Sequence, residues 1–152
     1  MGTLEPTAED SYFAWNYFDG ILMRKEYFNG AHCLYNEMWS EEKNKEVFGK
    51  CSNRNFHGHN FDVYVTVKGA PHPDTGFVMN AHILSRIIKK EVVERLDHKN
   101  FNLDVPELTG KFPSSENVAI QIWNWVKPHI QGCELHCVKL QETENIYVEY
   151  FG

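Results

Sequence analysis

The fold of this chain is decided by one stretch of sequence, Phe61-Asp62-Val63-Tyr64-Val65-Thr66-Val67-Lys68. Apolar and polar side chains alternate along it, and a period of two places all the apolar ones on one face of a β-strand. One apolar face and one polar face are typical of an antiparallel sheet that is buried on one side only. The stretch therefore predicts a half-buried strand, and the other elements can be arranged around it.

A second strand and a loop are expected before this stretch. Residues 21–28 alternate in part between apolar and polar side chains, which indicates a strand. Residues 36–45 are polar and charged and show neither a period of two nor one of 3.6. We expect them to form a loop that leads the chain to Cys51.

Two helices are expected after the stretch. Asn80 can cap a helix in which apolar residues recur at spacings of three and four. A second helix follows Pro113, with Ser114 or Ser115 as its N-cap. Glu116 falls in its first turn, where the helix dipole favours an acidic side chain.

The end of the chain predicts a β-hairpin. Two alternating runs cover residues 135–142 and 146–151, and the polar residues 143–145 separate them. The order of elements is then strand, strand, helix, helix, strand, strand. This order indicates an α+β fold with both helices on one face of a four-stranded antiparallel sheet.

Length and composition fit one domain preceded by a short arm. A chain of 152 residues with 42% hydrophobic residues can bury one core and is short for two. Residues 1–18 are acidic and aromatic without a clear period, so we expect an N-terminal arm there. The single domain is expected to span residues 19–152.

Charge and hydropathy exclude several classes of partner. The chain has 15 Lys and Arg residues and 21 Asp and Glu residues. It contains no run of basic residues, so nucleic acid is not an expected partner. No apolar stretch reaches the roughly 18–20 residues that cross a membrane. The first residues lack the pattern of a signal peptide, so we expect a cytoplasmic protein whose four cysteines are reduced.

Three histidines are candidate metal ligands. His57 and His59 stand two residues apart just before the deciding strand, so an extended chain points both imidazoles to the same side. His32, at the end of the first expected strand, is the natural third ligand. Three histidines around Zn²⁺ leave a fourth position open, as in catalytic zinc sites. The alternative is a chance His-x-His pattern in a chain with eight histidines.

Other candidates for chemistry lie on expected loops and element ends. Cys51 lies in a glycine-containing loop, where a nearby zinc ion and Lys50 would lower the pKa of its thiol; an inert thiol is the alternative. Asp97 and His98 follow the first helix and could relay a proton, or they could solvate the helix end. Glu142 ends the third expected strand, where a carboxylate could hold an amino-pyrimidinone edge or remain a surface residue.

Taken together, these motifs resemble the 6-pyruvoyl-tetrahydropterin synthase family, and the resemblance runs from about Leu22 to Gly152. The segments that carry it are Phe28-x3-His32, Cys51-x5-His57-Gly58-His59-Asn60, Leu96-Asp97-His98-Lys99-Asn100, Ser115-Glu116-Asn117-Val118-Ala119 and Glu142-Thr143. The resemblance implies the tunnelling fold and a homohexamer of two stacked trimers with active sites between subunits. It also implies Zn²⁺ as cofactor and 7,8-dihydroneopterin triphosphate as substrate, converted to 6-pyruvoyl-tetrahydropterin with elimination of triphosphate.

The resemblance also implies roles for single residues. The three histidines would hold zinc, Cys51 would move protons of the substrate side chain, and Asp97 with His98 would complete its relay. The pterin ring would be anchored by Glu142, with Ser115 and Glu116 beside it. The family usually carries Thr where this chain has a pair of serines.

Two other functions remain open at the level of sequence. The related 6-carboxytetrahydropterin synthase of queuosine biosynthesis uses the same substrate and zinc site but releases acetaldehyde. The five-residue gap between Cys51 and His57, and Asn80 in place of Asp, favour the pyruvoyl enzyme of tetrahydrobiopterin biosynthesis. A zinc protein that binds pterins without turnover would lack part of the catalytic set, which is complete here.

Overall fold

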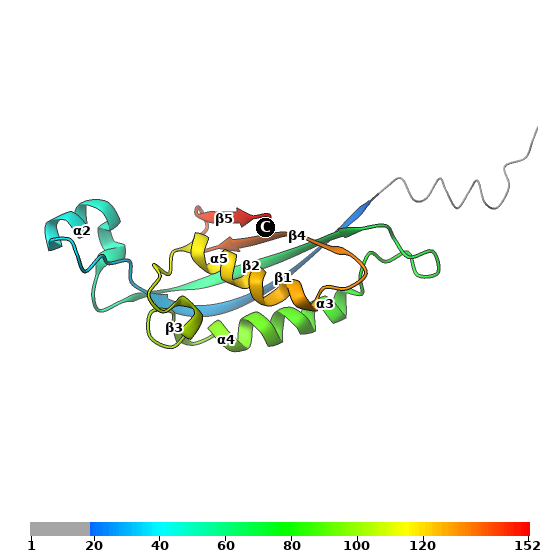
Figure 1. Cartoon of the computed structure of the whole chain (residues 1–152), viewed down its shortest axis with the longest axis horizontal. Coiled ribbons are helices and arrows are strands. Elements are labelled where there is room, and N and C mark those ends of the chain that lie inside the picture. Colours follow the sequence, from blue (N-terminus) through cyan, green and yellow to red (C-terminus); the bar gives the residue numbers. More distant parts are fainter. Residues whose placement is uncertain (1–18) are drawn as a thin grey trace, which may run out of the picture.

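A computed structural model describes residues 19–152 and has a five-stranded sheet at its centre (Figure 1). The strand order is β3-β1-β2-β4-β5. The strands are β1 Gly20–His32, β2 His57–Gly69, β3 Lys99–Asn100, β4 Glu134–Gln141 and β5 Tyr147–Tyr150. All neighbours pair antiparallel except β3, which pairs parallel with β1. The α+β class is therefore confirmed, but the prediction of a four-stranded antiparallel sheet was wrong.

The additional strand is β3, which is only two residues long. Lys99 and Asn100 pair with Gly30 and Ala31 at the end of β1. No hydrophobic period can be recognised in two residues, so the sequence could not indicate this strand. Its effect is to fix the residues just before it, Asp97 and His98, at the same end of the sheet as the histidines.

Both predicted helices are present. The first runs without a break through α3 Ala81–Ile88, a π-helical turn η2 Lys89–Val93 and α4 Glu94–Leu96. Its N-cap is Asn80, whose side chain accepts a hydrogen bond from His82 N. The second helix is α5 Ser115–Val126, followed by the 3-10 turn η4 Lys127–His129. Ser114, not Ser115, is the N-cap of α5.

The expected loop at residues 36–45 contains part of a helix, which corrects the sequence prediction. Helix α2 Glu41–Phe48 leads into the 3-10 turn η1 Gly49–Ser52, and a further 3-10 turn, η3 Pro106–Leu108, precedes α5. Ser40 caps α2, and its first turn contains two acidic residues. Because α2 has only one buried residue, Asn44, it has no apolar stripe by which the sequence could show a helix.

The hydrophobic core lies between one face of the sheet and the two predicted helices. Even-numbered residues of β1, such as Phe28, point into it, as do odd-numbered residues of β2, such as Val63 and Val65. Helix α3 packs on β1, while α5 packs on β4 and β5 (Figure 1). Because His32 is even-numbered and His57 and His59 are odd-numbered, the same alternation turns all three imidazoles toward the core face.

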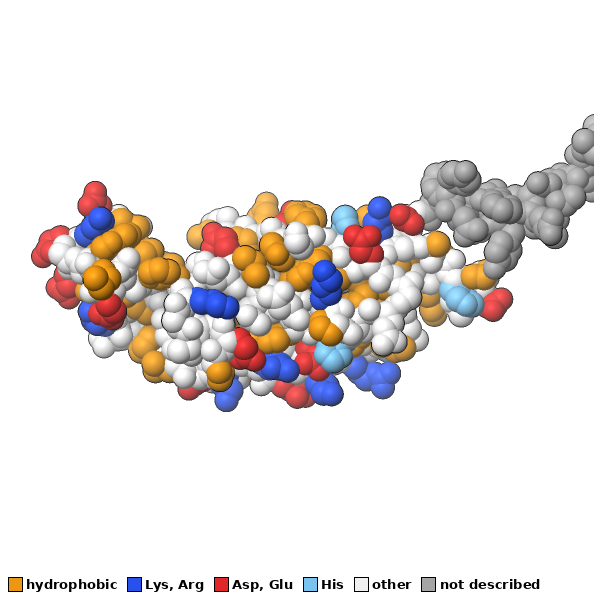
Figure 2. All heavy atoms as spheres, viewed as in Figure 1, with side chains coloured by type: hydrophobic (Ala, Val, Ile, Leu, Met, Phe, Trp, Pro, Cys, Tyr) orange, Lys and Arg blue, Asp and Glu red, His pale blue; other side chains and the backbone are white. Residues whose placement is uncertain are grey.

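The outer features agree with the expected charge pattern. Acidic and basic side chains are interspersed over the face shown in Figure 2, without a large patch of one sign. Helix α2 forms a lobe that projects beyond the end of the sheet (Figures 1 and 2). Within residues 19–152, no helix combines the length and the apolar character needed to span a membrane. The expected arm, residues 1–18, lies outside the described residues.

Candidate metal centre and adjoining cavities

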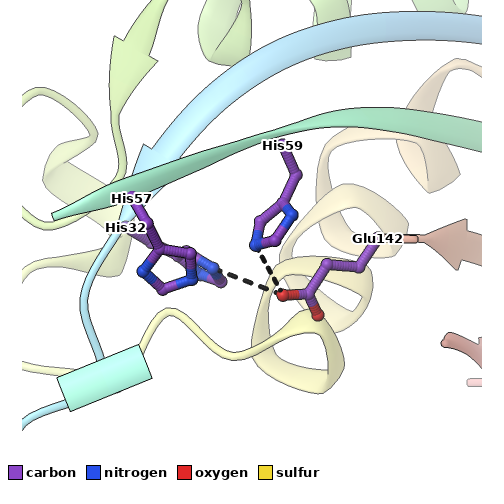
Figure 3. A group of neighbouring side chains, drawn as sticks. All are labelled: His32, His57, His59 and Glu142. Carbon is purple, nitrogen blue, oxygen red and sulfur yellow. Dashed lines mark ion pairs between the residues drawn. The ribbon is translucent and has the colours of Figure 1, made fainter. Parts of the chain in front are cut away.

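Three histidines converge at one end of the sheet (Figure 3). His32, the last residue of β1, is the direct cross-strand partner of His57, and His59 lies opposite Gly30. The ring centroids are 4.6 Å apart for His32 and His57, 4.9 Å for His57 and His59, and 5.3 Å for His32 and His59. The pairing of β1 with β2 thus brings His32 next to His57 and His59, which lie far from it in the sequence.

Glu142 completes this cluster from the end of β4. Its Oε1 atom lies 3.4 Å from His32 Nε2 and 3.1 Å from His59 Nε2 (Figure 3). Its Oε2 atom accepts a hydrogen bond of 2.6 Å from Ser115 Oγ in the first turn of α5. Contact with His32 above all, and then the bond from Ser115, lowers the pKa of Glu142 to about 2 although burial opposes this. The carboxylate is therefore ionised at neutral pH.

The cluster fits a divalent metal ion. One donor atom from each of the three histidines and from Glu142 lies within 4.8 Å of all the others. His32 Nδ1 is 2.7 Å from the carbonyl oxygen of Pro113, which leaves Nε2 directed at the cluster. Imidazole nitrogen and carboxylate oxygen are ligand types of zinc.

Unpaired nitrogens support the same conclusion. Both ring nitrogens of His57 have no hydrogen-bond partner among the described residues, and Nε2 of His32 and of His59 meet only Glu142 Oε1, at 3.4 and 3.1 Å, without the geometry of a hydrogen bond. Buried polar atoms without partners are rare because they lose their hydration without compensation. Burial, more than the neighbouring histidines, lowers the pKa of His57, and burial also lowers that of His59. Neutral imidazoles, as metal binding requires, are thus favoured.

Cys51 lies beside this cluster in the turn η1. It lines a cavity of about 1010 Å³ that is also lined by His57 and His59. A hydrogen bond of 2.8 Å from Leu34 N to the carbonyl oxygen of Cys51 holds the turn against the end of β1. Burial, followed by the negative charge of Glu142, raises the pKa of the Cys51 thiol. Without a metal ion, the pKa of Cys51 is therefore not lowered by Lys50 as expected.

Asp97 and His98 form a second pair. Asp97 Oδ1 accepts a hydrogen bond of 2.8 Å from Asn29 N, and Asp97 Oδ2 lies 2.8 Å from His98 Nδ1. The bond from Asn29 and then contact with His98 lower the pKa of Asp97. An ionised Asp97 can accept a hydrogen bond from Nδ1 of His98 and so hold the imidazole in place. The backbone of His98 has a positive φ of 57°.

The two candidate catalytic groups face different cavities. His98 lines a cavity of about 610 Å³ that shares Gly58 and His59 with the cavity of Cys51. Within residues 19–152, no hydrogen bond joins Cys51 to Asp97 or His98. In one chain, the thiol and the imidazole therefore line separate but adjoining cavities.

Of the two remaining candidate residues, Ser115 contacts the histidine cluster through Glu142 and Glu116 does not. Ser115 is buried and bonds to Glu142, whereas Glu116 is exposed and its side chain forms no hydrogen bond or ion pair with another described residue. Sequence reasoning missed the carbonyl group of Pro113, which orients His32. A backbone carbonyl has no signature in the sequence, and the only available signal was the place of Pro113 just before a helix that packs beside the histidines.

Together, the fold and the site define an α+β protein with a candidate metal centre of three histidines and one carboxylate at the end of its sheet. The model of the 6-pyruvoyl tetrahydropterin synthase family matches residues 21–152. The chain belongs to this family of pterin-synthesising enzymes.

Individual relatives agree with this assignment. The chain is 45% identical over 132 residues to the 6-pyruvoyl tetrahydrobiopterin synthase of Dictyostelium discoideum, covering 87% of this chain and 96% of that protein. It is 41% identical over 131 residues to the protein of the same name from Homo sapiens, covering 86% of this chain and 90% of that protein. The solved structure of Caenorhabditis elegans 6-pyruvoyl tetrahydropterin synthase superposes with a TM-score of 0.82 at 33% identity, covering 88% of this chain and 96% of that one.

Proposed function

We propose that this protein is a zinc-dependent lyase that converts 7,8-dihydroneopterin triphosphate to 6-pyruvoyl-tetrahydropterin and eliminates triphosphate. The observation that carries the proposal is the convergence of three inward-facing imidazoles beside a cavity that contains Cys51, in a chain that matches the pterin synthase family over residues 21–152. Such a reaction needs a site that acidifies C–H bonds and a base that can take and return protons.

His32, His57 and His59 would hold the zinc ion. When bound, zinc would supply Lewis acidity to the oxygens of the substrate side chain. His32 is fixed by Pro113, so its ring is already oriented before the metal arrives. Ring nitrogens that form no hydrogen bond in the protein alone would then coordinate the metal ion.

Glu142 lies close enough to the histidines to be a fourth metal ligand, but we propose that it anchors the pterin ring and leaves the fourth metal position open. An ionised carboxylate can accept two parallel hydrogen bonds from the N–H groups of an amino-pyrimidinone edge. The hydrogen bond from Ser115 fixes the carboxylate of Glu142 at the first turn of α5, so a ring held there has its side chain next to the histidines. Glu116, exposed in the same turn, would assist at the outer edge of the ring.

Cys51 would remove and return the protons of the substrate side chain, with Asp97 and His98 as its relay. Because the thiol and the imidazole face different cavities in one chain, we propose that the relay is completed between two copies. This arrangement suits the homohexamer, a dimer of trimers, that the family resemblance implies. The protein would act in the cytoplasm.

The product identifies the reaction. Zinc-loaded protein is incubated anaerobically with 7,8-dihydroneopterin triphosphate, and the pterin product is identified by mass spectrometry while acetaldehyde is assayed in parallel. A three-carbon side chain is expected. A carboxy product with acetaldehyde would assign the queuosine-pathway reaction instead, and unchanged substrate would contradict both.

Asn80 distinguishes the pyruvoyl from the carboxy product less clearly than expected from the sequence. Its side chain caps α3 through His82 N, at 2.9 Å. Asn and Asp are about equally good N-caps, so an Asn here satisfies the helix whichever product is formed. The product assay is therefore the decisive measurement.

A further inference from the structure

The cavity beside Cys51 has a basic lining that the chemistry described so far does not use. Lys45, Lys50 and Arg54 line it, together with one acidic residue, Glu41. The chain as a whole carries a net charge of -6, so a local excess of basic groups runs against its average. Clefts lined by one sign of charge concentrate ligands of the opposite sign.

The cavity on the other side of Gly58 differs in charge. Among its lining residues are one lysine, Lys99, and one acid, Asp104. Of these two cavities beside the candidate metal centre, the one lined by Cys51 has more basic than acidic side chains in its lining, and the other does not. A polyanionic group next to the histidines is better accommodated on the Cys51 side.

The basic groups are carried by one well-held segment. Lys45 is in the last turn of α2, and Lys50 immediately precedes Cys51 in η1. The segment is fixed by the buried Asn44, whose side chain accepts from Asn36 N and donates to Asn36 O. The lobe shows both signs of charge in Figure 2, so the distinguishing feature is the position of these lysines at the cavity and not the charge of the lobe.

Arg54 is held in a fixed orientation. Its guanidinium group lies 3.9 Å from the centre of the Tyr35 ring and forms two hydrogen bonds with Glu37, of 3.2 and 3.0 Å. Glu37 compensates the charge of Arg54, so the excess positive charge of the lining comes from Lys45 and Lys50. The guanidinium group of Arg54 can still donate from its remaining N–H groups. Tyr35 also lines the cavity, so the stacked pair forms part of its wall.

We propose that Lys45, Lys50 and Arg54 form a polyphosphate subsite, which binds the phosphate chain of the substrate and determines the preference for a phosphorylated pterin. The inference rests on the proposed function, because it places the pterin ring at Glu142 and its side chain at the histidines. The end of that side chain then enters the cavity of Cys51, where the three basic groups lie.

The test separates binding of phosphate from binding of the ring. Inorganic tripolyphosphate and unphosphorylated 7,8-dihydroneopterin are each titrated into the zinc-loaded protein by calorimetry. The metal content is checked before and after, because polyphosphates chelate divalent ions. The variant carries Lys45→Met together with Lys50→Met. The matched control is Lys43→Met in the same helix, because the ammonium group of Lys43 lies 4.5 Å from the centre of the Trp39 ring and does not line the cavity.

The double variant is expected to bind tripolyphosphate at least about tenfold more weakly, with a smaller dependence on salt. Its affinity for dihydroneopterin, and both affinities of the control, should stay within about twofold of the wild type. Unchanged tripolyphosphate binding in a double variant that still binds dihydroneopterin would overturn the subsite. If instead the wild type binds tripolyphosphate through these lysines but forms no pterin product, the subsite stands and the proposed function fails.

Discussion

At the scale of single residues, the thiol and the imidazoles have separable tasks. Cys51→Ala is expected to keep the fold and the metal but to lose turnover by a factor of about 10² or more, since general acid–base groups contribute about 10²–10⁴. His57→Ala should lose metal as well, because it removes one of the three imidazoles that we propose as metal ligands. Metal analysis and product formation on the same samples check both, with Cys51→Ser as the conservative variant. Full turnover of Cys51→Ala would exclude the thiol from the mechanism.

A buried carboxylate in β1 gives a second prediction. Glu26 accepts hydrogen bonds from Ser85 Oγ, at 2.6 Å, and from Arg24 Nε, at 2.9 Å. Burial alone would raise the pKa of Glu26, but these two bonds outweigh it and the pKa is lowered. Ser85→Ala is therefore expected to reduce the free energy of unfolding by about 1–3 kcal/mol at neutral pH.

The pH dependence of that effect has a definite sign. A carboxyl group whose pKa is lowered by folding stabilises the native state above its unfolded pKa, which is about 4.3 for Glu. The stabilisation is lost as the pH falls through the lower folded value. Urea unfolding of wild type and Ser85→Ala should therefore differ most above pH 5 and converge in acid. Glu26→Gln, which cannot ionise, is the control, and a Ser85→Ala effect that persists unchanged in acid would contradict this account.

At the scale of elements, the junction of β1 with β3 depends on one glycine. A Cβ atom at Gly30 would lie 2.2 Å from the nearest atom of the buried Phe101 ring. Gly30→Ala is expected to cost about 1–3 kcal/mol through overpacking. Thermal and urea unfolding measure the loss. The double variant Gly30→Ala with Phe101→Leu should recover part of it, and equal stability of Gly30→Ala and wild type would show that the ring can move away freely.

The elements that the sequence predicted are those with a clear hydrophobic period. Strand β2 and helix α5 bury one face each, so their apolar side chains recur at the spacing of their geometry. Helix α2 was missed because it buries an asparagine and packs few apolar groups, and β3 was missed because it has two residues. Single-sequence reasoning therefore recovered the layers of the fold but not the two pieces that flank the site.

The candidate site, too, could be predicted from the sequence only in part. The inward direction of His57 and His59 follows from their spacing, and alternation along β1 gives the same direction for His32. The contact of Glu142 with the histidines depends on the register between β2 and β4, which a sequence pattern does not specify. The separation of Cys51 from His98 was likewise unpredictable, because it depends on the path of a short connection and not on any period.

At the scale of the whole molecule, the placement of Cys51 and His98 at different cavities leads to a prediction for oligomers assembled from two different variants. Cys51→Ala and His98→Ala are each expected to be inactive alone. If the relay is completed between copies, denaturing and refolding an equal mixture should restore about a quarter of the sites, since each site then draws its two groups from different chains. Turnover of the mixture measures this, and light scattering gives the expected mass of six chains.

A mixture that remains inactive while reaching the same mass would show that the relay forms within one chain. A monomeric mass would contradict the hexamer. The refolded wild type and each refolded single variant are the controls, because they show how much activity and assembly survive the procedure.

The direct pairing of His32 with His57 across β1 and β2 has a consequence for how the chain matures. A shift of one residue between these strands would turn one imidazole to the opposite face of the sheet, and the three could no longer share an ion. Only the correctly aligned hairpin would bind metal with all three. Since a ligand stabilises the state that binds it, the metal ion of the proposed reaction would also select the strand alignment that can hold it. Metal content would then report the fraction of chains that had folded correctly.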